Sequence, residues 1–159
     1  MQELFQLVPA SYVVFRRGGQ VLLQLRQNTG FMDGHWACAA AGHVEAGESA
    51  LAAALREAAE ETGLRVDPLD LLPLSTLHRR NDGQGALAQR VDFFFSTTRW
   101  AGTPTIMEPG KCAAMEWFDL HDLPEPMPEH ERYVLENLAA KTLPAIASLG
   151  FGDGPGPGV

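Results

Sequence analysis

The segment from Ser49 to Thr62 constrains the fold of this chain more than any other part of its sequence. Its residues are mostly strong helix formers, and Gly63 supplies the left-handed conformation in which helices commonly end. Small or apolar side chains recur at three- and four-residue steps, at Leu51, Ala54, Leu55, Ala58 and Thr62. This spacing predicts an amphipathic helix with one face buried against the rest of the protein.

Segments typical of strands lie on both sides of this helix. Two β-branched and aliphatic runs, 11–16 and 21–26, flank a glycine turn and predict a hairpin. Further strands are predicted at 36–40, 71–77, 90–98 and 113–118, a loop at 79–88, and a second amphipathic helix at 129–143. We therefore expect one α/β domain over residues 1–149, followed by a glycine- and proline-rich tail at 150–159.

Composition agrees with one soluble globular domain. Of the 159 residues, 45% are apolar and 20% are charged, which suits a single hydrophobic core. Lysine and arginine total 12 against 20 acidic residues, and the net charge of −8 disfavours non-specific nucleic-acid binding. No apolar run reaches the roughly 18 residues that span a bilayer, and no basic leader is present. With only two cysteines, too few for a disulfide framework, a cytoplasmic location is expected.

Three carboxylates gather on one face of the predicted helix. Glu57, Glu60 and Glu61 stand at i, i+3 and i+4, so all three project from a single turn. The glycine-bracketed loop 42–47 leads into the helix through Glu48, which adds a fourth carboxylate. Taken alone, such a triplet is more often a solvated acidic face. Together with the loop, it has the oxygen ligands that Mg²⁺ prefers.

The same residues carry a resemblance to the Nudix hydrolases. The signature of that family is a glycine, five residues, a glutamate, seven residues, and then arginine-glutamate-aliphatic-any-glutamate-glutamate-any-glycine-aliphatic. Every gap is correct in this chain, where the positions are Gly42, Glu48, Arg56, Glu57, Ala58, Glu60, Glu61, Gly63 and Leu64. Ala58 is smaller than the usual aliphatic residue, and Ala40 stands where many members have proline. A looser resemblance extends over most of residues 11–124.

The resemblance implies a fold, a cofactor and a set of site residues. The implied fold is a mixed β-sheet sandwiched between α-helices. Family members use Mg²⁺ or Mn²⁺ to cleave a nucleoside diphosphate linked to another group. By this resemblance the metal ligands are Glu57, Glu60 and Glu61, one of which could double as the base. Glu48 is a supporting ligand, Gly42 or Ala41 offers a carbonyl, and Arg56 orients the carboxylates.

Four residues outside the signature are candidates for direct roles. Glu108 lies in a loop where similar enzymes often place a further catalytic glutamate, although a plain loop carboxylate is the alternative. The densest positive charge in the chain is at His78, Arg79 and Arg80, which would suit a substrate's phosphates. The alternative is that these residues are the solvated end of a strand. Core packing is favoured over base stacking for the tryptophans Trp36 and Trp117, and no catalytic thiol is expected.

For the substrate, the sequence favours a nucleoside or deoxynucleoside 5′-triphosphate, cleaved to monophosphate and pyrophosphate. Residues 79–82 lack the proline or tyrosine that marks ADP-ribose and dinucleoside polyphosphate hydrolases of this superfamily. One rival is a pyrophosphohydrolase of nucleoside-diphosphate sugars or RNA 5′ ends. Another is a catalytically silent nucleotide sensor, against which the complete glutamate set argues. The oligomeric state stays open, a homodimer included.

Overall fold

The computed structural model describes residues 1–81 and 89–152 of the chain. The part of the expected loop at 82–88 and the part of the expected tail at 153–159 lie outside the described residues. In chain order the elements are β1 (Val8–Arg17), β2 (Gln20–Arg26), β3 (Trp36–Cys38), β4 (Ala40–His43), α1 (Ala50–Thr62), a 3₁₀ turn (Pro68–Asp70), β5 (Leu72–Arg80), β6 (Gln89–Thr97), β7 (Cys112–Asp119), α2 (Glu129–Ala140) and β8 (Ile146–Leu149).

The strands form one mixed sheet. Its order within the described residues is β3-β2-β1-β6-β5-β8, with β4 paired to β1 and β7 paired to β2. β1 runs parallel to β6, and β5 runs parallel to β8, whereas the other pairs are antiparallel. The predicted hairpin is confirmed, because Arg16 pairs with Val21 and Arg17 with Gln20 across a tight turn.

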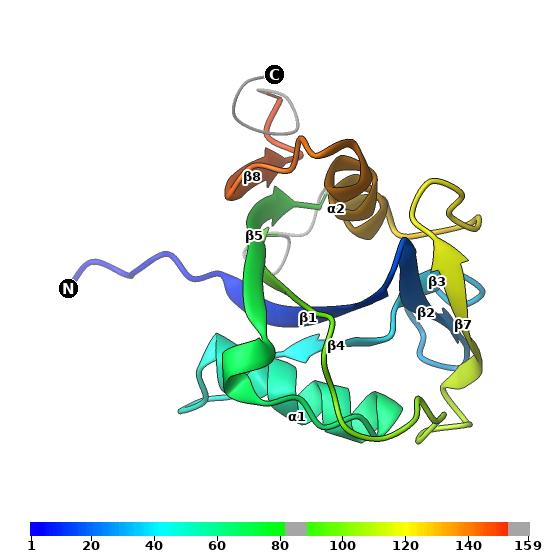
Figure 1. Cartoon of the computed structure of the whole chain (residues 1–159). Helices are drawn as coiled ribbons and strands as arrows, with labels where there is room; N and C mark the ends of the chain where they lie inside the picture. The colour runs from blue at the N-terminus through cyan, green and yellow to red at the C-terminus, as the bar shows by residue number, and fades with distance from the viewer. Residues whose placement is uncertain (82–88, 153–159) are drawn as a thin grey trace.

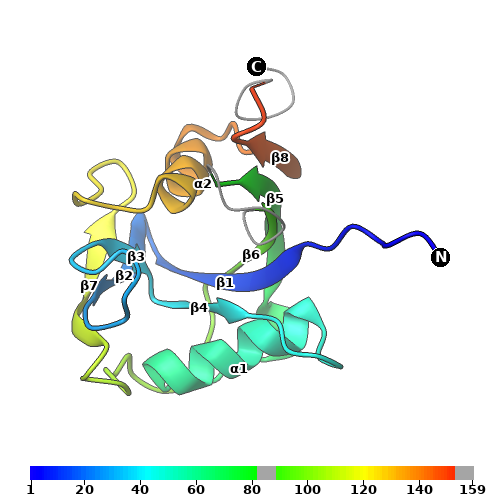
Figure 2. The same ribbon diagram turned by 180° about the vertical axis from the view of Figure 1, so that it is seen from behind.

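The two helices cover opposite faces of this sheet (Figures 1 and 2). Alternate side chains of β1 point to different faces, as the strand repeat requires. Tyr12 and Val14 belong to the hydrophobic core under α2, whereas Val13 and Phe15 belong to the core over α1. The expected fold, a mixed sheet sandwiched between helices, is therefore confirmed. β1 and β4 connect the two cores, so they lie at the centre of the molecule.

Several boundaries differ from the sequence prediction. The single strand expected at 36–40 is two strands, because the chain passes from pairing with β2 to pairing with β1 near Ala39. β5 continues through Arg80, so the predicted loop does not include Arg79 and Arg80. α2 ends at Ala140, where Lys141 takes the left-handed conformation with a φ of 59°.

β8 was not predicted from the sequence. Its four residues, Ile146–Leu149, extend the sheet by parallel pairing with β5. Beyond it, the ring of Phe151, a residue assigned to the tail, lies 4.6 Å from the ring of His78. In the described part of the chain, no helix is both long and apolar enough to cross a membrane.

Candidate active site

Helix α1 is positioned by defined signals at both ends. The Ser49 side chain accepts a hydrogen bond from the Ala52 amide at 3.0 Å, which caps the N-terminus. At the other end Gly63 has a φ of 71°, and its amide donates to the carbonyl of Ala59. The face toward the sheet is made of small buried side chains: Ala53, Ala54, Ala58 and Thr62. Because these side chains are short, the helix lies close to the sheet and its carboxylates lie close to β4.

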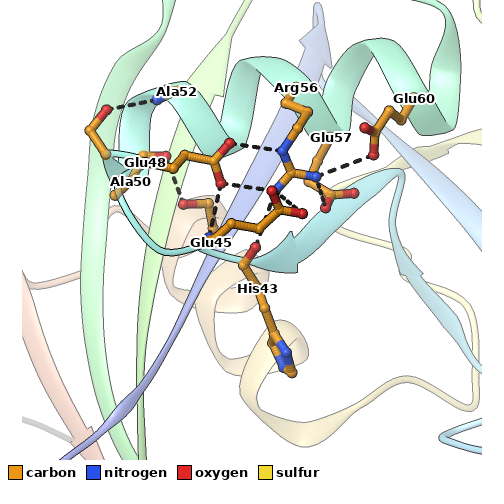
Figure 3. Close-up of polar contacts among 10 residues, drawn as sticks. His43, Glu45, Glu48, Ala50, Ala52, Arg56, Glu57 and Glu60 are labelled. Carbon is orange, nitrogen blue, oxygen red and sulfur yellow. Dashed lines mark hydrogen bonds and ion pairs between the residues drawn. The ribbon is translucent and has the colours of Figure 1, made fainter.

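Arg56 is the centre of the carboxylate cluster (Figure 3). Its Nε and Nη2 atoms donate to the two oxygens of Glu48 at 2.8 and 2.9 Å. Nη1 donates to Glu57 at 2.8 Å and to Glu60 at 3.2 Å, and Nη2 reaches the carbonyl of His43 at 3.2 Å. The predicted role for Arg56, orienting these carboxylates, matches this set of charge-assisted hydrogen bonds.

Both oxygens of Glu48 are engaged by the protein. One accepts from Arg56 Nε, and the other accepts from Arg56 Nη2 and from the Glu45 amide at 3.0 Å. The hydrogen bonds from Arg56 lower the pKa of Glu48 to about 2. Glu48 therefore fixes the loop and Arg56 to one another, which is compatible with the supporting position expected for it.

Glu57 lies against β4 at the position of Gly42. A β-carbon on residue 42 would overlap the Glu57 carboxylate, so only glycine leaves room for it. Burial raises the pKa of Glu57, although Arg56 opposes that rise. The glycine of the sequence signature thus has a direct physical reason in this chain.

Glu61 is the most buried of the three helix carboxylates. Its Oε2 atom accepts a hydrogen bond from the Ala41 amide of β4 at 2.7 Å. Burial raises the pKa of Glu61 to about 8, and the charges of Glu57 and Glu108 add to that rise. The side chain of Gln24 on β2, which donates to the Cys38 carbonyl at 3.2 Å, lowers this pKa. Glu61 is thus held against β4 and retains a high affinity for a proton.

These side chains open into a polar cleft of about 450 Å³. The cleft is lined by carboxylates, by the cations at its rim and by residues of β2, β4 and β7: Gln24, Arg26, Asn28, Thr29, Ala41, Glu45, Arg56, Glu57, Glu60, Glu61, Glu108, Lys111 and Cys112. Glu108, predicted from its loop position, therefore joins the helix glutamates. Its loop is attached to the end of β2, since Gln27 and Asn28 donate to the carbonyls of Pro109 and Gly110 at 2.9 and 3.1 Å.

The cleft contains suitable donor atoms for a divalent cation, but they are not arranged as a finished coordination shell. In residues 1–81 and 89–152, no three acidic, histidine or cysteine side chains are close enough together to hold an ion as they stand. Arg56 binds Glu57 and Glu60 in this arrangement and relieves part of their mutual repulsion. A cation would therefore have to compete with Arg56 for these carboxylates.

The three residues predicted to bind phosphate separate into different environments, because successive side chains of a strand point to opposite faces. Arg79 is buried and forms an ion pair with Asp92 of β6, with a further hydrogen bond to Asn81 at 2.9 Å. His78 packs against Phe151, and Arg80 is exposed. Arg79 and Arg80 line cavities on the α2 side of the sheet, not the carboxylate cleft.

Two residues that line the cleft, Gln24 and Arg26, were not predicted from the sequence. Gln24 and Arg26 interrupt or end the apolar run of β2, and a polar residue in a buried strand could have been noticed there. Trp36 packs edge-on to Phe118 at 4.7 Å, and Trp117 stacks on Trp100 at 5.8 Å, so both have the packing roles that were favoured.

Comparison with known proteins finds a family whose profile matches this sequence and solved structures with a similar fold. The profile of the NUDIX domain matches residues 6–138. A crystal structure of a MutT NUDIX hydrolase from Burkholderia pseudomallei is 27% identical, with a TM-score of 0.74 over 82% of this chain and 97% of that chain. A MutT protein from Bacillus halodurans shares the fold at 22% identity and a TM-score of 0.71, over 92% of each chain. A UDP-X diphosphatase does so at 18% identity and a TM-score of 0.66, over 94% of this chain and 70% of that one.

The profile covers most of the chain, and the fold is shared with these hydrolases. The chain therefore belongs to the NUDIX family and is a pyrophosphohydrolase, an enzyme that hydrolyses phosphoanhydride bonds.

Proposed function

We propose that the chain hydrolyses a nucleoside or deoxynucleoside 5′-triphosphate to the monophosphate and pyrophosphate, with Mg²⁺ or Mn²⁺ as cofactor. The observation that carries this proposal is the cleft itself, where Glu57, Glu60, Glu61 and Glu108 come together. An acidic cleft of this kind repels a polyphosphate unless cations lie between the two.

The donor set of the cleft fits a hard divalent cation. Glu57, Glu60 and Glu61 would hold the ion through carboxylate oxygens, with the backbone carbonyl of Gly42 or Ala41 beside them and Glu48 in support. When bound, such an ion neutralises phosphate charge and lowers the pKa of water. The glycine at residue 42 supports this assignment, because it lets the Glu57 carboxylate lie directly against β4.

The protein's own residues have further tasks in this proposal, and Glu61 has one besides holding the ion. Glu61 is the candidate base, because its buried carboxyl has a raised pKa and a fixed Oε2 atom on the Ala41 amide. Water attacks the α-phosphorus, the bond from that phosphorus to the bridging oxygen breaks, and pyrophosphate leaves. Arg26 and Lys111 line the same cleft and offer positive charge to the departing pyrophosphate.

Product analysis tests this function. Each common ribo- and deoxyribonucleoside triphosphate is incubated with the protein and Mg²⁺ or Mn²⁺, and phosphate is assayed with and without an added inorganic pyrophosphatase. We expect monophosphate, and phosphate that appears only when the helper enzyme is present. Direct release of orthophosphate with the diphosphate as the other product, from every triphosphate, would contradict attack at the α-phosphorus.

Three rivals give different results when nucleoside-diphosphate sugars and triphosphorylated RNA are added to this screen. A hydrolase of nucleoside-diphosphate sugars would release a sugar phosphate and leave the triphosphates intact, and an RNA 5′-end hydrolase would act on triphosphorylated RNA instead. A nucleotide sensor would bind without turnover. The cluster around Arg56 favours an enzyme, since a binding module has no need for four glutamates on one arginine.

A further inference from the structure

A second cavity, of about 290 Å³, lies next to the carboxylate cleft. Arg26 of β2 and Ala41 of β4 line both spaces. A molecule whose phosphates occupy the cleft can therefore extend past these two residues into the second cavity. Its volume is at the lower end of the roughly 300–1,000 Å³ found for ligand pockets, which suits one heterocycle with its sugar better than a second nucleotide.

The walls of this cavity suit a flat ring. Ala10, Ala37 and Ala41 contribute only methyl groups. Phe31, which is about half exposed, forms an aromatic wall, and the guanidinium of Arg26 lies 5.9 Å from the centre of that ring. Aromatic and guanidinium surfaces of this kind stack on nucleobases without regard to sequence. Selection among bases therefore has to come from a polar group in the cavity.

Among the polar side chains that line this cavity, the acidic one is Glu131, from the first turn of α2. Only 4% of the residue is exposed, yet it lines the cavity. Its Oε1 atom accepts a hydrogen bond from the Cys38 amide at 2.7 Å, and the Cys38 thiol, a weak donor, also lowers its pKa. A buried carboxylate with so few donors is costly, and a ligand that supplies donors would relieve that cost.

The neighbouring histidine does not neutralise Glu131. His130 Nε2 lies 3.8 Å from Glu131 Oε2, but burial lowers the pKa of His130 to about 3, so the imidazole is neutral near pH 7. Its Nε2 atom also lies 3.1 Å from the Tyr12 hydroxyl, with which it shares a hydrogen bond. Burial raises the pKa of Glu131 to about 7, so above that pH its carboxylate is an acceptor at the cavity wall. Within residues 1–81 and 89–152, no arginine or lysine forms an ion pair with it, although the charge of Arg26 lowers its pKa.

We propose that this cavity takes the base of the substrate and that Glu131 selects bases with a ring N–H beside a carbonyl, namely guanine, hypoxanthine, uracil and thymine. A carboxylate accepts from such an N–H, and guanine adds a second donor in its amino group. Adenine and cytosine place an unprotonated ring nitrogen at the same position, and two acceptors repel. This inference deepens the proposed function and rests on it, because it assigns the base of that same substrate.

Hypoxanthine and adenine form the sharpest pair of probes, because their nucleotides differ only at the selected edge. We would measure the binding of dIMP and dAMP by calorimetry in EDTA, at about pH 8.5, where Glu131 is ionised. The wild-type protein should bind dIMP at least about tenfold more tightly than dAMP, and Glu131→Gln should reduce that ratio to about twofold. The glutamine side chain keeps an oxygen that can accept from the Cys38 amide. Because it carries both a donor and an acceptor, it can pair with either base and no longer discriminates between them.

Glu129→Gln is the matched control, because Glu129 is an exposed acid on the same helix turn. It should retain the wild-type ratio. No measurable binding of dIMP, equal binding of both nucleotides to the wild type, or an unchanged ratio in Glu131→Gln would each overturn the inference. Because the titration involves neither turnover nor metal, it stays separate from the product screen: a chain that prefers dIMP but cleaves no triphosphate would contradict the proposed function alone.

Discussion

The carboxylate of Glu57 occupies the space that the β-carbon of any other residue in place of Gly42 would need. β4 of the central sheet and α1 therefore pack against each other here with no space for a β-carbon on residue 42. The contact joins the first residue of the sequence signature to its first helix glutamate, and it lies at the edge of the cleft.

Gly42→Ala should therefore damage catalysis more than folding. The added methyl group would push the Glu57 carboxylate out of position, and a displacement of about 1 Å can cost about 10²-fold in turnover. The measurement is kcat on the best triphosphate together with a thermal melt. Gly19→Ala is the control, because a β-carbon there meets no atom within 4 Å and the residue does not require a positive φ. Equal rates for the two variants would contradict the role of this contact.

Substitution of the helix carboxylates should abolish most activity without unfolding the protein. Glu57→Gln, Glu60→Gln and Glu61→Gln should each lower turnover by at least about 10²-fold, because the amide keeps the shape but loses the charge. Glu108→Gln, on an exposed loop, should have a smaller or substrate-dependent effect. Steady-state kinetics would check this, with the exposed Glu116→Gln as control. Near-normal rates in all three helix variants would refute the site assignment.

Divalent metal should stabilise the folded protein through the same carboxylates. An ion that binds only the folded state adds about 2.7 kcal/mol at a concentration of 100 Kd, which raises the melting midpoint by several degrees in a domain of this size. The double variant Glu57→Gln with Glu61→Gln should lose most of that gain. Thermal melts in EDTA and in Mg²⁺, at equal ionic strength, compare the two. An identical metal response would place the ion elsewhere.

The raised pKa of Glu61 predicts a particular dependence of stability on pH in the metal-free protein. Its folded pKa is about 8, above the usual 4.5, so its contribution to stability is complete below pH 4.5 and is lost as the pH rises toward 8. The loss cannot exceed about 1.4 kcal/mol per pH unit for one group. Relative to Glu61→Gln, the wild type should therefore weaken between pH 5 and 8. Urea unfolding in EDTA measures this difference, and parallel curves for the two proteins would contradict it.

Arg79 should matter for folding through its ion pair with Asp92. Both residues are buried, and Arg79→Met leaves the Asp92 carboxylate without its partner, which should cost about 3–5 kcal/mol. Adding Asp92→Leu should restore most of the lost stability, because the unpaired charge is then gone. Chemical denaturation of both variants tests this. Arg80→Ala, at an exposed neighbouring position, should leave stability nearly unchanged. A stable Arg79→Met protein would mean that the pair contributes little.

Local signals explain why the helix and its carboxylates could be predicted from the sequence. Ser49 and Gly63 mark the ends of α1 by themselves, and the steps between the glutamates fix their common face. The ion pair of Arg79 with Asp92 could not be predicted, because Asp92 lies on another strand and only the register of β5 against β6 brings the two residues together. β8 was missed for a similar reason, since its parallel pairing with β5 depends on α2 returning the chain to the sheet edge.

Glu131 illustrates the same limit. In the sequence it is one of several acids at the start of α2, and its burial follows only from the docking of that helix on β3, where the Cys38 amide meets it. No spacing rule connects residues 38 and 131. Most carboxylates of the cleft come from one short sequence motif, whereas the residues that line the cavity beside it come from distant parts of the chain.

The shared border between the two spaces has a consequence for how such an enzyme could change over generations. Arg26 and Ala41 are the meeting point, while the carboxylates come from α1 on one face of the sheet and Glu131 from α2 on the other. Mutations in the first turns of α2 could therefore change which substrates bind while the carboxylates of α1 stay unchanged. A library restricted to those turns would explore new selectivities from a scaffold that keeps its reaction.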